Sequence, residues 1–488
     1  MLKMFPNHSF SDFVVVKEGC FAHLMRVEWS WRMLFWLRTD LSFSYCSRLS
    51  KKWILVIHSL SEKPHDCINI FRFHQKNACK SAVIMVHSHY NLMFGREKGI
   101  SMNYVFISPH FPSNFKNFAV GLKKAGVHVF GIASEPYELL DTDLRESLTE
   151  YFRVNDMENY DEMLRAVAYL TYKHGKMDRI ESHNEYWLAQ DARLRTDFNV
   201  FGFKNEDMAF VKLKSAMKEK FSEFGIRVAR GRVIGDYQDA LGLCHEYGFP
   251  VCIKPDSGVG AADTHKIRSE EELGHFFHVK NPYESYILEE FIDGKIVTYD
   301  GLTDANGNIL FDATLVYEKA VLEIVEKNAD MFYYVDRNMP DDLREIGTKL
   351  VQAFNVRERF FHFEFFRLPD GSLVALEANL RPPGGHTMDM WNWANDVDLY
   401  AAYGELVATG NFTAQMHFHY YCCYVSRKGV HPYRFTHEEV MARYGGNVVL
   451  FEEMPGIFAA IMGDFGYVIR AAEYQELMDI IHMISVPE

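Results

Sequence analysis

Three polar side chains alternate with apolar residues at Glu377, Asn379 and Arg381. Successive side chains of a strand point to opposite faces, so this period of two places all three on one face. Glu364 lies in the preceding strand-like stretch, and the turn at Pro369 predicts a hairpin that brings it close to Glu377. Carboxylate and amide oxygens suit Mg2+ bound together with phosphates, and arginine suits phosphoryl oxygens. We therefore predict a metal and phosphate site at this hairpin.

A solvated polar strand face with an incidental ion pair is the competing interpretation of these residues. For any one of the four, that interpretation describes the commoner case. The four side chains occur together, however, and the Pro-Pro-Gly-Gly run at residues 382–385 follows them directly. We therefore favour the metal site.

A lysine and a loop of small residues further upstream are suited to bind a triphosphate. Residues 251–255 are typical of a strand that carries Lys254 to its end. Ser257, Gly258 and Gly260 follow in a stretch of small residues. Backbone N–H groups of such a loop can close over phosphates, and the lysine supplies a point charge. The pattern GxxxxGK[ST] is absent, so the loop is not a P-loop.

A third stretch combines an apolar strand with a polar end. Residues 285–288 are apolar enough for a buried strand, and they are followed by Glu289, Glu290, Phe291 and Ile292. Backbone groups at the edge of such a strand can form hydrogen bonds with a planar ligand. We expect this edge to frame a purine base.

The elements that must position these residues begin near residue 104. There the pattern alternates between strands and helices, which is typical of a parallel sheet. The expected elements are strands at 104–107, 127–132 and 178–181 and helices at 115–125 and 161–172. A helix at 212–224 and a strand at 226–234 follow.

The second half of the chain shows the signals of antiparallel sheet. Asn306-Gly307 and Pro369-Asp-Gly are hairpin turns between strand-like stretches. After residue 416, we expect strands at 417–425, 447–451 and 457–462 and helices near Glu438 and Tyr474.

The order of these motifs resembles the ATP-grasp superfamily over residues 102–415. The resemblance is carried, in chain order, by Lys214 on a helix, Lys254 with its glycine loop, the Glu289–Ile292 stretch, Glu364, and the run from Glu377 to Gly385. The chain is most similar to the biotin carboxylase and carbamoyl-phosphate synthase branch and to the amino-acid ligases related to it.

The resemblance implies a role for each matching residue. Lys214 and Lys254 would contact ATP phosphates, and Ser257, Gly258 and Gly260 would close over them. Glu289, with the backbone of Glu290, Phe291 and Ile292, would hold the adenine. Glu364, Glu377 and Asn379 would bind Mg2+ or Mn2+, and Arg381 would stabilise an acyl phosphate. Lys212 is an alternative to Lys214, and no ribose ligand can be assigned after Gly294.

The resemblance also implies a fold of mixed α/β and α+β class in several parts. A Rossmann-like pre-ATP-grasp domain would span 102–205, and the ATP-grasp lid subdomain would span 206–295. The ATP-grasp catalytic subdomain would then occupy 296–415, and a small α+β C-terminal subdomain would occupy 416–488.

The activity that the resemblance implies is an ADP-forming carboxylate-amine ligase that uses ATP and Mg2+. Its substrates would be a small carboxylate and an amine. The alternatives are a biotin-carboxylase-like enzyme that uses bicarbonate and a regulatory protein that binds ATP without turnover.

Composition excludes several other classes. The 488-residue chain carries a net charge of −14, which argues against a nucleic-acid surface. We find no apolar run long enough to span a membrane. Eight scattered cysteines without metal-ligand spacing are typical of a reducing compartment, so we expect a cytoplasmic protein, with a homodimer as a possible assembly.

Residues 1–101 differ from the rest in composition. Their net charge is +7, against −21 for the remainder, and they show no sustained period. We expect an extension with no clear fold of its own, and Met102 is a candidate for the true start.

Overall fold

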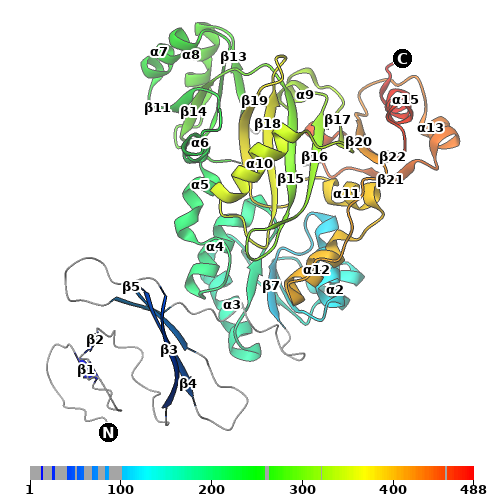
Figure 1. Cartoon of the computed structure of the whole chain (residues 1–488). Helices are drawn as coiled ribbons and strands as arrows, with labels where there is room; N and C mark the ends of the chain where they lie inside the picture. Colours follow the sequence, from blue (N-terminus) through cyan, green and yellow to red (C-terminus); the bar gives the residue numbers. More distant parts are fainter. Residues whose placement is uncertain are drawn as a thin grey trace. The chain divides into compact units, whose positions relative to one another are not determined.

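The computed structural model describes residues 102–258, 263–319, 321–456 and 459–488, together with six strands between Asp12 and Val86. The chain divides into two compact units, Met1–Lys98 and Gly99–Glu488 (Figure 1). In the first unit, β1 (Asp12–Val14) pairs antiparallel with β2 (Met25–Val27). A four-stranded antiparallel sheet follows, formed by β3 (Leu41–Leu49), β4 (Lys52–Ser59), β5 (Asn69–His74) and β6 (Val83–Val86). Most of this unit lies outside the described residues, so the prediction for residues 1–101 stays a prediction.

The second unit begins with a four-stranded parallel sheet of order β10-β7-β8-β9. Its strands are β7 (Asn103–Ile107), β8 (His128–Ala133), β9 (Glu150–Arg153) and β10 (Arg179–Glu181). Its helices are α1 (Lys116–Lys124), α2 (Thr142–Ser147), α3 (Tyr160–His174) and α4 (Leu188–Asp197). The side chain of Asn159 caps the start of α3, and Gly175, at φ 88°, ends it. The alternating pattern of the sequence is confirmed here.

An antiparallel sheet of order β11-β14-β12-β13 forms the next layer. It contains β11 (Gly231–Ile234), β12 (Val251–Pro255), β13 (His265–Ile267) and β14 (Tyr286–Glu290), covered by α7 (Tyr237–Tyr247) and α8 (Glu270–Val279). The helix predicted at 212–224 is confirmed as α6 (Lys214–Glu223). It begins two residues later than predicted, because the extended backbone of Leu213 pairs with Ser257 and separates α6 from the preceding α5 (Met208–Lys212). The predicted strand at 226–234 is also shorter and begins at residue 231.

The largest sheet has eight strands in the order β19-β18-β15-β16-β17-β20-β22-β21. Its strands are β15 (Lys295–Thr303), β16 (Ile309–Tyr317), β17 (Phe332–Asp336), β18 (Phe360–Arg367), β19 (Leu373–Asn379), β20 (Tyr421–Arg427), β21 (Val448–Glu453) and β22 (Phe465–Ala471). Both predicted hairpins are confirmed as β15–β16 and β18–β19.

The helices of this half of the chain pack against the sheet or against other helices. They are α9 (Val321–Lys327), α10 (Asp341–Ala353), α11 (Thr387–Asn395), α12 (Leu399–Thr409), α13 (His437–Tyr444), α14 (Ala459–Met462) and α15 (Tyr474–Ser485). The strand predicted at 457–462 is wrong, since residues 459–462 form α14 and the real strand, β22, follows at 465–471. The apolar run there packs as a helix beside α9 instead of pairing in the sheet.

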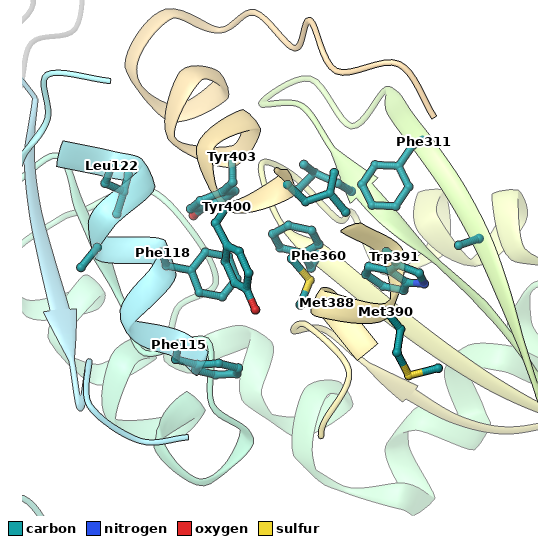
Figure 2. Packing of buried hydrophobic residues seen from close by; sticks show 14 of the residues in the cluster. Phe115, Phe118, Leu122, Phe311, Phe360, Met388, Met390, Trp391, Tyr400 and Tyr403 are labelled. Atoms are coloured by element: carbon teal, nitrogen blue, oxygen red, sulfur yellow. The ribbon is translucent and has the colours of Figure 1, made fainter. Parts of the chain in front are cut away.

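Close packing joins the parallel-sheet domain to the large sheet. A Cβ atom added to Gly121 of α1 would lie 2.1 Å from the Tyr400 carbonyl oxygen, and one added to Gly404 of α12 would lie 2.3 Å from the Gly121 carbonyl oxygen. Two glycines therefore let the helix backbones touch. Figure 2 shows the aromatic side chains of Phe118 and Tyr403 filling the space around this contact. Burying each such side chain contributes about 1.5–3 kcal/mol, which favours one fixed arrangement of these layers.

None of the helices within the described residues has the length and apolarity needed to cross a membrane.

Candidate active site

A cavity of about 1000 Å³ brings together residues from the four-stranded antiparallel sheet and the eight-stranded sheet. Nine of the residues predicted from the sequence line it: Lys214, Lys254, Glu289, Glu290, Phe291, Ile292, Glu364, Glu377 and Arg381. These residues are far apart in the chain, and only the packing of the two sheets collects them.

Two lysines enclose a single carboxylate on one side of the cavity. Glu289 of β14 lies 3.0 Å from Lys254 Nζ and 2.9 Å from Lys218 Nζ. All three side chains are buried. Burial disfavours a charged lysine, but Glu289 outweighs it and holds the pKa of Lys254 above its usual value. The two cations share one anion, so this side of the cavity keeps a net positive charge that suits phosphate.

The Glu289 carboxylate has both oxygens facing lysines. Burial raises the pKa of this carboxyl, whereas Lys254 and Lys218 lower it and hold it below its usual range. The negative charge of Glu289 is thus compensated by two lysines of the protein itself. An adenine contact by this side chain remains a prediction.

Lys214 links the start of α6 to the opposite sheet. Its Nζ lies 3.1 Å from Glu377 Oε1 and donates to the carbonyl oxygen of Gly258 at 3.5 Å. Lys212, the alternative phosphate lysine, instead donates to the carbonyl oxygen of Glu185 at 3.1 Å. Lys214 therefore lies in the cavity, and Lys212 lies beside it.

Glu364 and Glu377 are directly paired across β18 and β19. Burial and the neighbouring Glu364 raise the pKa of Glu377, although Lys214 lowers it. Glu364 has a different partner, because His362 Nε2 lies 3.2 Å from its carboxylate. Burial alone would raise the pKa of Glu364, but His362 holds it below its usual value. Two partly buried carboxylates, whose pKa values are shifted in opposite directions, thus share one short stretch of sheet.

The second ring nitrogen of His362 also has a carboxylate partner. Its Nδ1 lies 2.7 Å from Asp300, and Thr298 donates a 2.5 Å hydrogen bond to the same carboxylate. Burial lowers the pKa of His362, but the carboxylates of Asp300 and Glu364 outweigh burial and raise it to about 9. Because both ring nitrogens face carboxylates, the ring has one orientation available. It holds Glu364 in place.

Asn379 and Arg381 complete the strand end. Asn379 Nδ2 donates to Glu364 at 3.3 Å, and Arg381 Nη2 donates weakly to Asn379 Oδ1 at 3.5 Å. The strongest contact of Arg381 is an ion pair of 2.5 Å with Glu185, from the loop after β10. The parallel-sheet domain therefore contributes a residue that contacts the cavity-lining Arg381.

Comparison with known proteins shows which domain family includes these cavity residues. The family model of the ATP-grasp domain matches residues 247–389, which include Lys254, Glu364, Glu377 and Arg381. The chain carries an ATP-grasp domain.

Named relatives and solved structures agree with the ATP-grasp assignment. The L-arginine-specific L-amino acid ligase of Bacillus subtilis is 28% identical over 246 residues, covering 47% of this chain and 59% of that enzyme. The carbamoyl phosphate synthase large chain of Thermotoga petrophila is 27% identical over 196 residues, covering 37% of this chain and 17% of that one. The crystal structure of the L-amino acid ligase from Bacillus licheniformis has a TM-score of 0.61 at 14% identity, covering 78% of this chain and 96% of that one. The matched part of the chain spans less than two thirds of the length of the Bacillus subtilis ligase and of the Thermotoga petrophila synthase chain.

The far end of the ATP-grasp cavity is formed by the residues after β14. Glu290 is paired with Arg230, whose Nε lies 2.8 Å from its carboxylate. The Lys266 ammonium lies 3.7 Å from the centre of the Phe291 ring. Ile292 and Leu376 also line the cavity here. An adenine contact at this end of the cavity stays a prediction.

Two of the predicted loop residues lie away from the cavity lining. Ser257 is exposed and forms an isolated bridge with Leu213, and Gly258 contributes only its carbonyl oxygen to Lys214. Gly260 lies outside the described residues. Whether this loop closes over phosphates remains a prediction.

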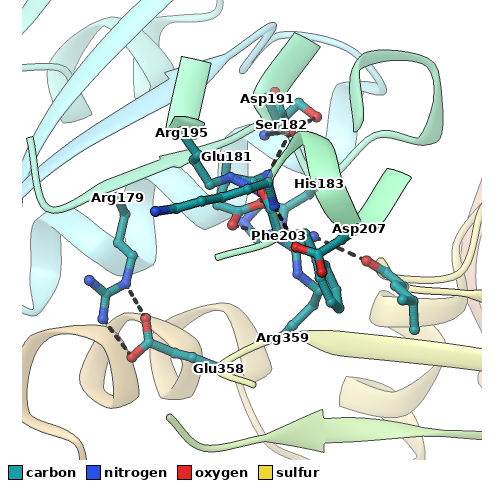
Figure 3. Close-up of polar contacts among 12 residues, drawn as sticks. Arg179, Glu181, Ser182, His183, Asp191, Arg195, Phe203, Asp207, Glu358 and Arg359 are labelled. Atoms are coloured by element: carbon teal, nitrogen blue, oxygen red, sulfur yellow. Dashed lines mark hydrogen bonds and ion pairs between the residues drawn. The ribbon is translucent and has the colours of Figure 1, made fainter. Parts of the chain in front are cut away.

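A buried ionic network surrounds Glu181, the last residue of β10, four positions before Glu185 (Figure 3). Glu181 lies between two arginines: Arg359 forms an ion pair with it, and Arg195 Nη2 lies 3.4 Å away. Arg359 Nη1 also donates to the Leu380 carbonyl oxygen at 3.0 Å. Arg359 thus links the end of β10 to the residue before Arg381, and Glu185 contacts Arg381 itself. The ion pair with Glu185 orients the Arg381 guanidinium.

Three residues of the site escaped the sequence analysis. Lys218 follows Lys214 by four positions on α6, so helical spacing was the available signal. His362 precedes Glu364 by two positions and shares its strand face. Glu185 gave no signal, since its partner Arg381 is 196 positions away.

The donor set fits a hard divalent cation. Mg2+ is commonly held by one or two carboxylates together with phosphates, and Glu364 and Glu377 provide two close carboxylates whose mutual repulsion favours an added cation. The amide of Asn379 could offer its oxygen after turning about its terminal bond. No group of three or more His, Cys, Asp and Glu side chains forms a metal cluster within the described residues. A site here would need phosphates to complete it.

Proposed function

We propose that the protein is an ATP- and Mg2+-dependent ligase that activates a carboxylate as an acyl phosphate for attack by an amine. One observation carries the proposal: a buried lysine, two adjacent carboxylates and a fixed arginine line the same cavity. A carboxylate is a poor acyl donor, since its leaving group would be oxide. Phosphorylation by ATP supplies a leaving group that the amine can displace.

The charges of the cavity residues suggest a role for each of them. Lys254 and Lys218, with their single shared carboxylate, would hold the phosphates of ATP. Glu364, Glu377 and Asn379 would hold Mg2+ or Mn2+, which when bound offsets charge on the transferred phosphoryl group. Positioning and fixed electrostatics supply most of the catalysis in phosphoryl transfer, so no covalent nucleophile is needed.

Arg381 would meet the charge that develops during phosphoryl transfer. Its guanidinium is paired with Glu185 and lies past the two carboxylates on the same chain segment. A planar cation at that point can hold the substrate carboxylate and then the acyl phosphate. Glu185 would keep it oriented while substrates exchange.

Hydroxylamine trapping tests the proposal. With a suitable acid, ATP and Mg2+ but no amine, added hydroxylamine should yield a hydroxamate together with ADP and phosphate. AMP and pyrophosphate would mean adenylation and would contradict it. Activity with bicarbonate alone would favour the carboxylase alternative, and ATP binding without turnover on any acid would favour a regulatory protein.

The metal assignment has its own test. Glu377→Gln and Asn379→Asp should change the Mg2+ dependence of ATP turnover much more than they change thermal unfolding. Unchanged Mg2+ activation in both variants would remove these residues from the metal site.

A further inference from the structure

We infer that the acid substrate of this ligase carries a large apolar side chain, which packs against an apolar wall beside Arg381. The inference rests on the proposed function and adds the class of substrate. The apolar wall consists of Tyr317, Met331, Tyr333, Ile461 and Met462, all of which line the cavity.

The apolar wall lies next to the proposed reaction centre. Tyr317 ends β16, and burial, Tyr333 and Glu364 raise the pKa of its hydroxyl, whereas Arg381 lowers it. Tyr317 also lines the same cavity as Glu364, a proposed metal ligand, and Arg381, the proposed carboxylate-binding residue. An acid whose carboxylate is held at Arg381 would place its side chain on this wall.

The wall is rigid before any substrate binds. The Tyr317 and Tyr333 rings are stacked with centroids 4.9 Å apart, and Tyr333 stacks in turn on Tyr424 at 5.6 Å. Tyr424 is held by a 2.7 Å hydrogen bond from its hydroxyl to the Met462 carbonyl oxygen. A preformed aromatic face binds an apolar group without a large loss of side-chain entropy.

The charges near the wall are already matched within the protein. Three carboxylates line this end of the cavity, and each has a cationic partner: Glu318 with Lys295 at 3.2 Å, Glu323 with Lys327 at 2.8 Å, and Glu326 with Arg268 at 3.0 Å. At this end of the cavity, the described residues therefore leave no unpaired carboxylate for a cationic substrate side chain. A charged group placed on the aromatic face would lose hydration without gaining a partner.

Two glycines leave room in front of the wall. A Cβ atom at Gly385, whose φ is 61°, would lie 3.0 Å from the Tyr333 hydroxyl and 3.1 Å from Met462 Cε, so this glycine lies against the wall. A Cβ atom at Gly384 would have nothing within 4 Å. The space over Gly384 is where a substrate side chain fits.

The test measures hydroxamate formation by the full chain with ATP, Mg2+ and a panel of acids that share one α-carboxylate. The panel contains L-alanine, L-leucine, L-phenylalanine, L-glutamate and L-arginine. We expect kcat/KM for L-leucine or L-phenylalanine to exceed that for L-alanine by about tenfold or more, as is usual for added methylenes in an apolar pocket. A preference for L-arginine or L-glutamate, or no preference, would overturn the inference.

Variants of the wall locate the preference. Tyr317→Ala should lower kcat/KM for the large apolar acid by about tenfold and leave that for L-alanine and the affinity for ATP much less affected. Tyr317→Phe restores the ring and should restore the preference. Tyr172→Ala, which removes a tyrosine that is 91% exposed on α3, is the matched control. An unchanged preference in Tyr317→Ala would place the side chain elsewhere.

A third variant fills the proposed space. Gly384→Val should exclude the large apolar acid but still allow L-alanine to be activated, which reverses the order of the panel. Equal loss on every acid would mean that the space over Gly384 does not receive the substrate side chain. If wild-type protein binds ATP but forms hydroxamate with no acid at all, the ligase proposal itself fails, which is a different result from a wrong preference.

Discussion

The two sides of the cavity balance their charges in opposite ways. Beside the four-stranded sheet, Lys218 and Lys254 share Glu289. Their ammonium nitrogens lie 2.9 and 3.0 Å from its carboxylate oxygens. On the eight-stranded sheet, Glu364 and Glu377 are paired with each other across the strands. Burial and Glu364 raise the pKa of Glu377. The first side has an excess of positive charge and the second has carboxylates that repel each other.

This difference separates residues that build the site from residues that bind ligands. Glu289 is needed to make two buried lysines tolerable, so its loss should damage the fold. Burial and Glu364 raise the pKa of Glu377, and its carboxylate faces the cavity beside Glu364, so its loss should damage function more than folding. The predictions below test that contrast, beginning with the largest expected effect.

Glu289→Gln should destabilise the protein by about 3–5 kcal/mol, because removing one partner leaves buried lysines without compensation. Glu377→Gln should cost less, because Glu377 is only partly buried and pairs with one lysine, Lys214, whereas Glu289 is buried between two. Denaturant unfolding measures both. If the two variants are destabilised equally, the contrast between the two sides is wrong.

Arg381→Ala should lower hydroxamate formation about a hundredfold or more while much of the ATP affinity is kept. The guanidinium is expected to meet charge that develops during transfer, and losing one such donor costs about 2.7–4 kcal/mol. Single-turnover hydroxamate assays and nucleotide binding measure the two effects. Arg381→Lys, which keeps the charge but loses the planar fork, should recover only part of the rate. Near-normal turnover in Arg381→Ala would make this residue structural.

His362→Gln should raise the Mg2+ concentration needed for half-maximal ATP turnover by about 10- to 100-fold. His362 and Asp300 hold Glu364 from behind, and losing a residue that orients a metal ligand usually costs that much affinity. A Mg2+ titration of turnover measures the shift. His128→Gln, at an exposed position on β8, is the control. A fall in maximal rate without any change in Mg2+ dependence would assign His362 to the fold alone.

The smallest effect is expected from removing residues 1–101. The fragment Met102–Glu488 contains every residue of the cavity, and we expect it to fold and bind ATP like the full chain. Thermal unfolding and nucleotide binding of both forms give the comparison. A fragment that is insoluble while the full chain is well behaved would make the first segment a genuine domain.

Local patterns were sufficient for much of the fold. The alternation at Glu377, Asn379 and Arg381, with the turn at Pro369, predicted the β18–β19 hairpin and its polar face. The strand predicted at 457–462 was wrong, because a short apolar run fits a buried helix as well as a strand. The break at Leu213 was also missed, since it depends on a bridge to Ser257 across the fold.

The sequence by itself determined the order of the motifs, the types of their side chains and the faces on which they lie, because turns and periodicity act over a few residues. The tertiary structure alone decided which charges meet. It brought Glu185 to Arg381, joined Lys218 and Lys254 through Glu289, and placed Tyr317 in the same cavity as Glu364 and Glu377. These pairings join positions that are far apart in the chain, and no local pattern specifies them. They exist because the sheets and helices of residues 102–488 pack in one arrangement, which brings these charges within ion-pair distance.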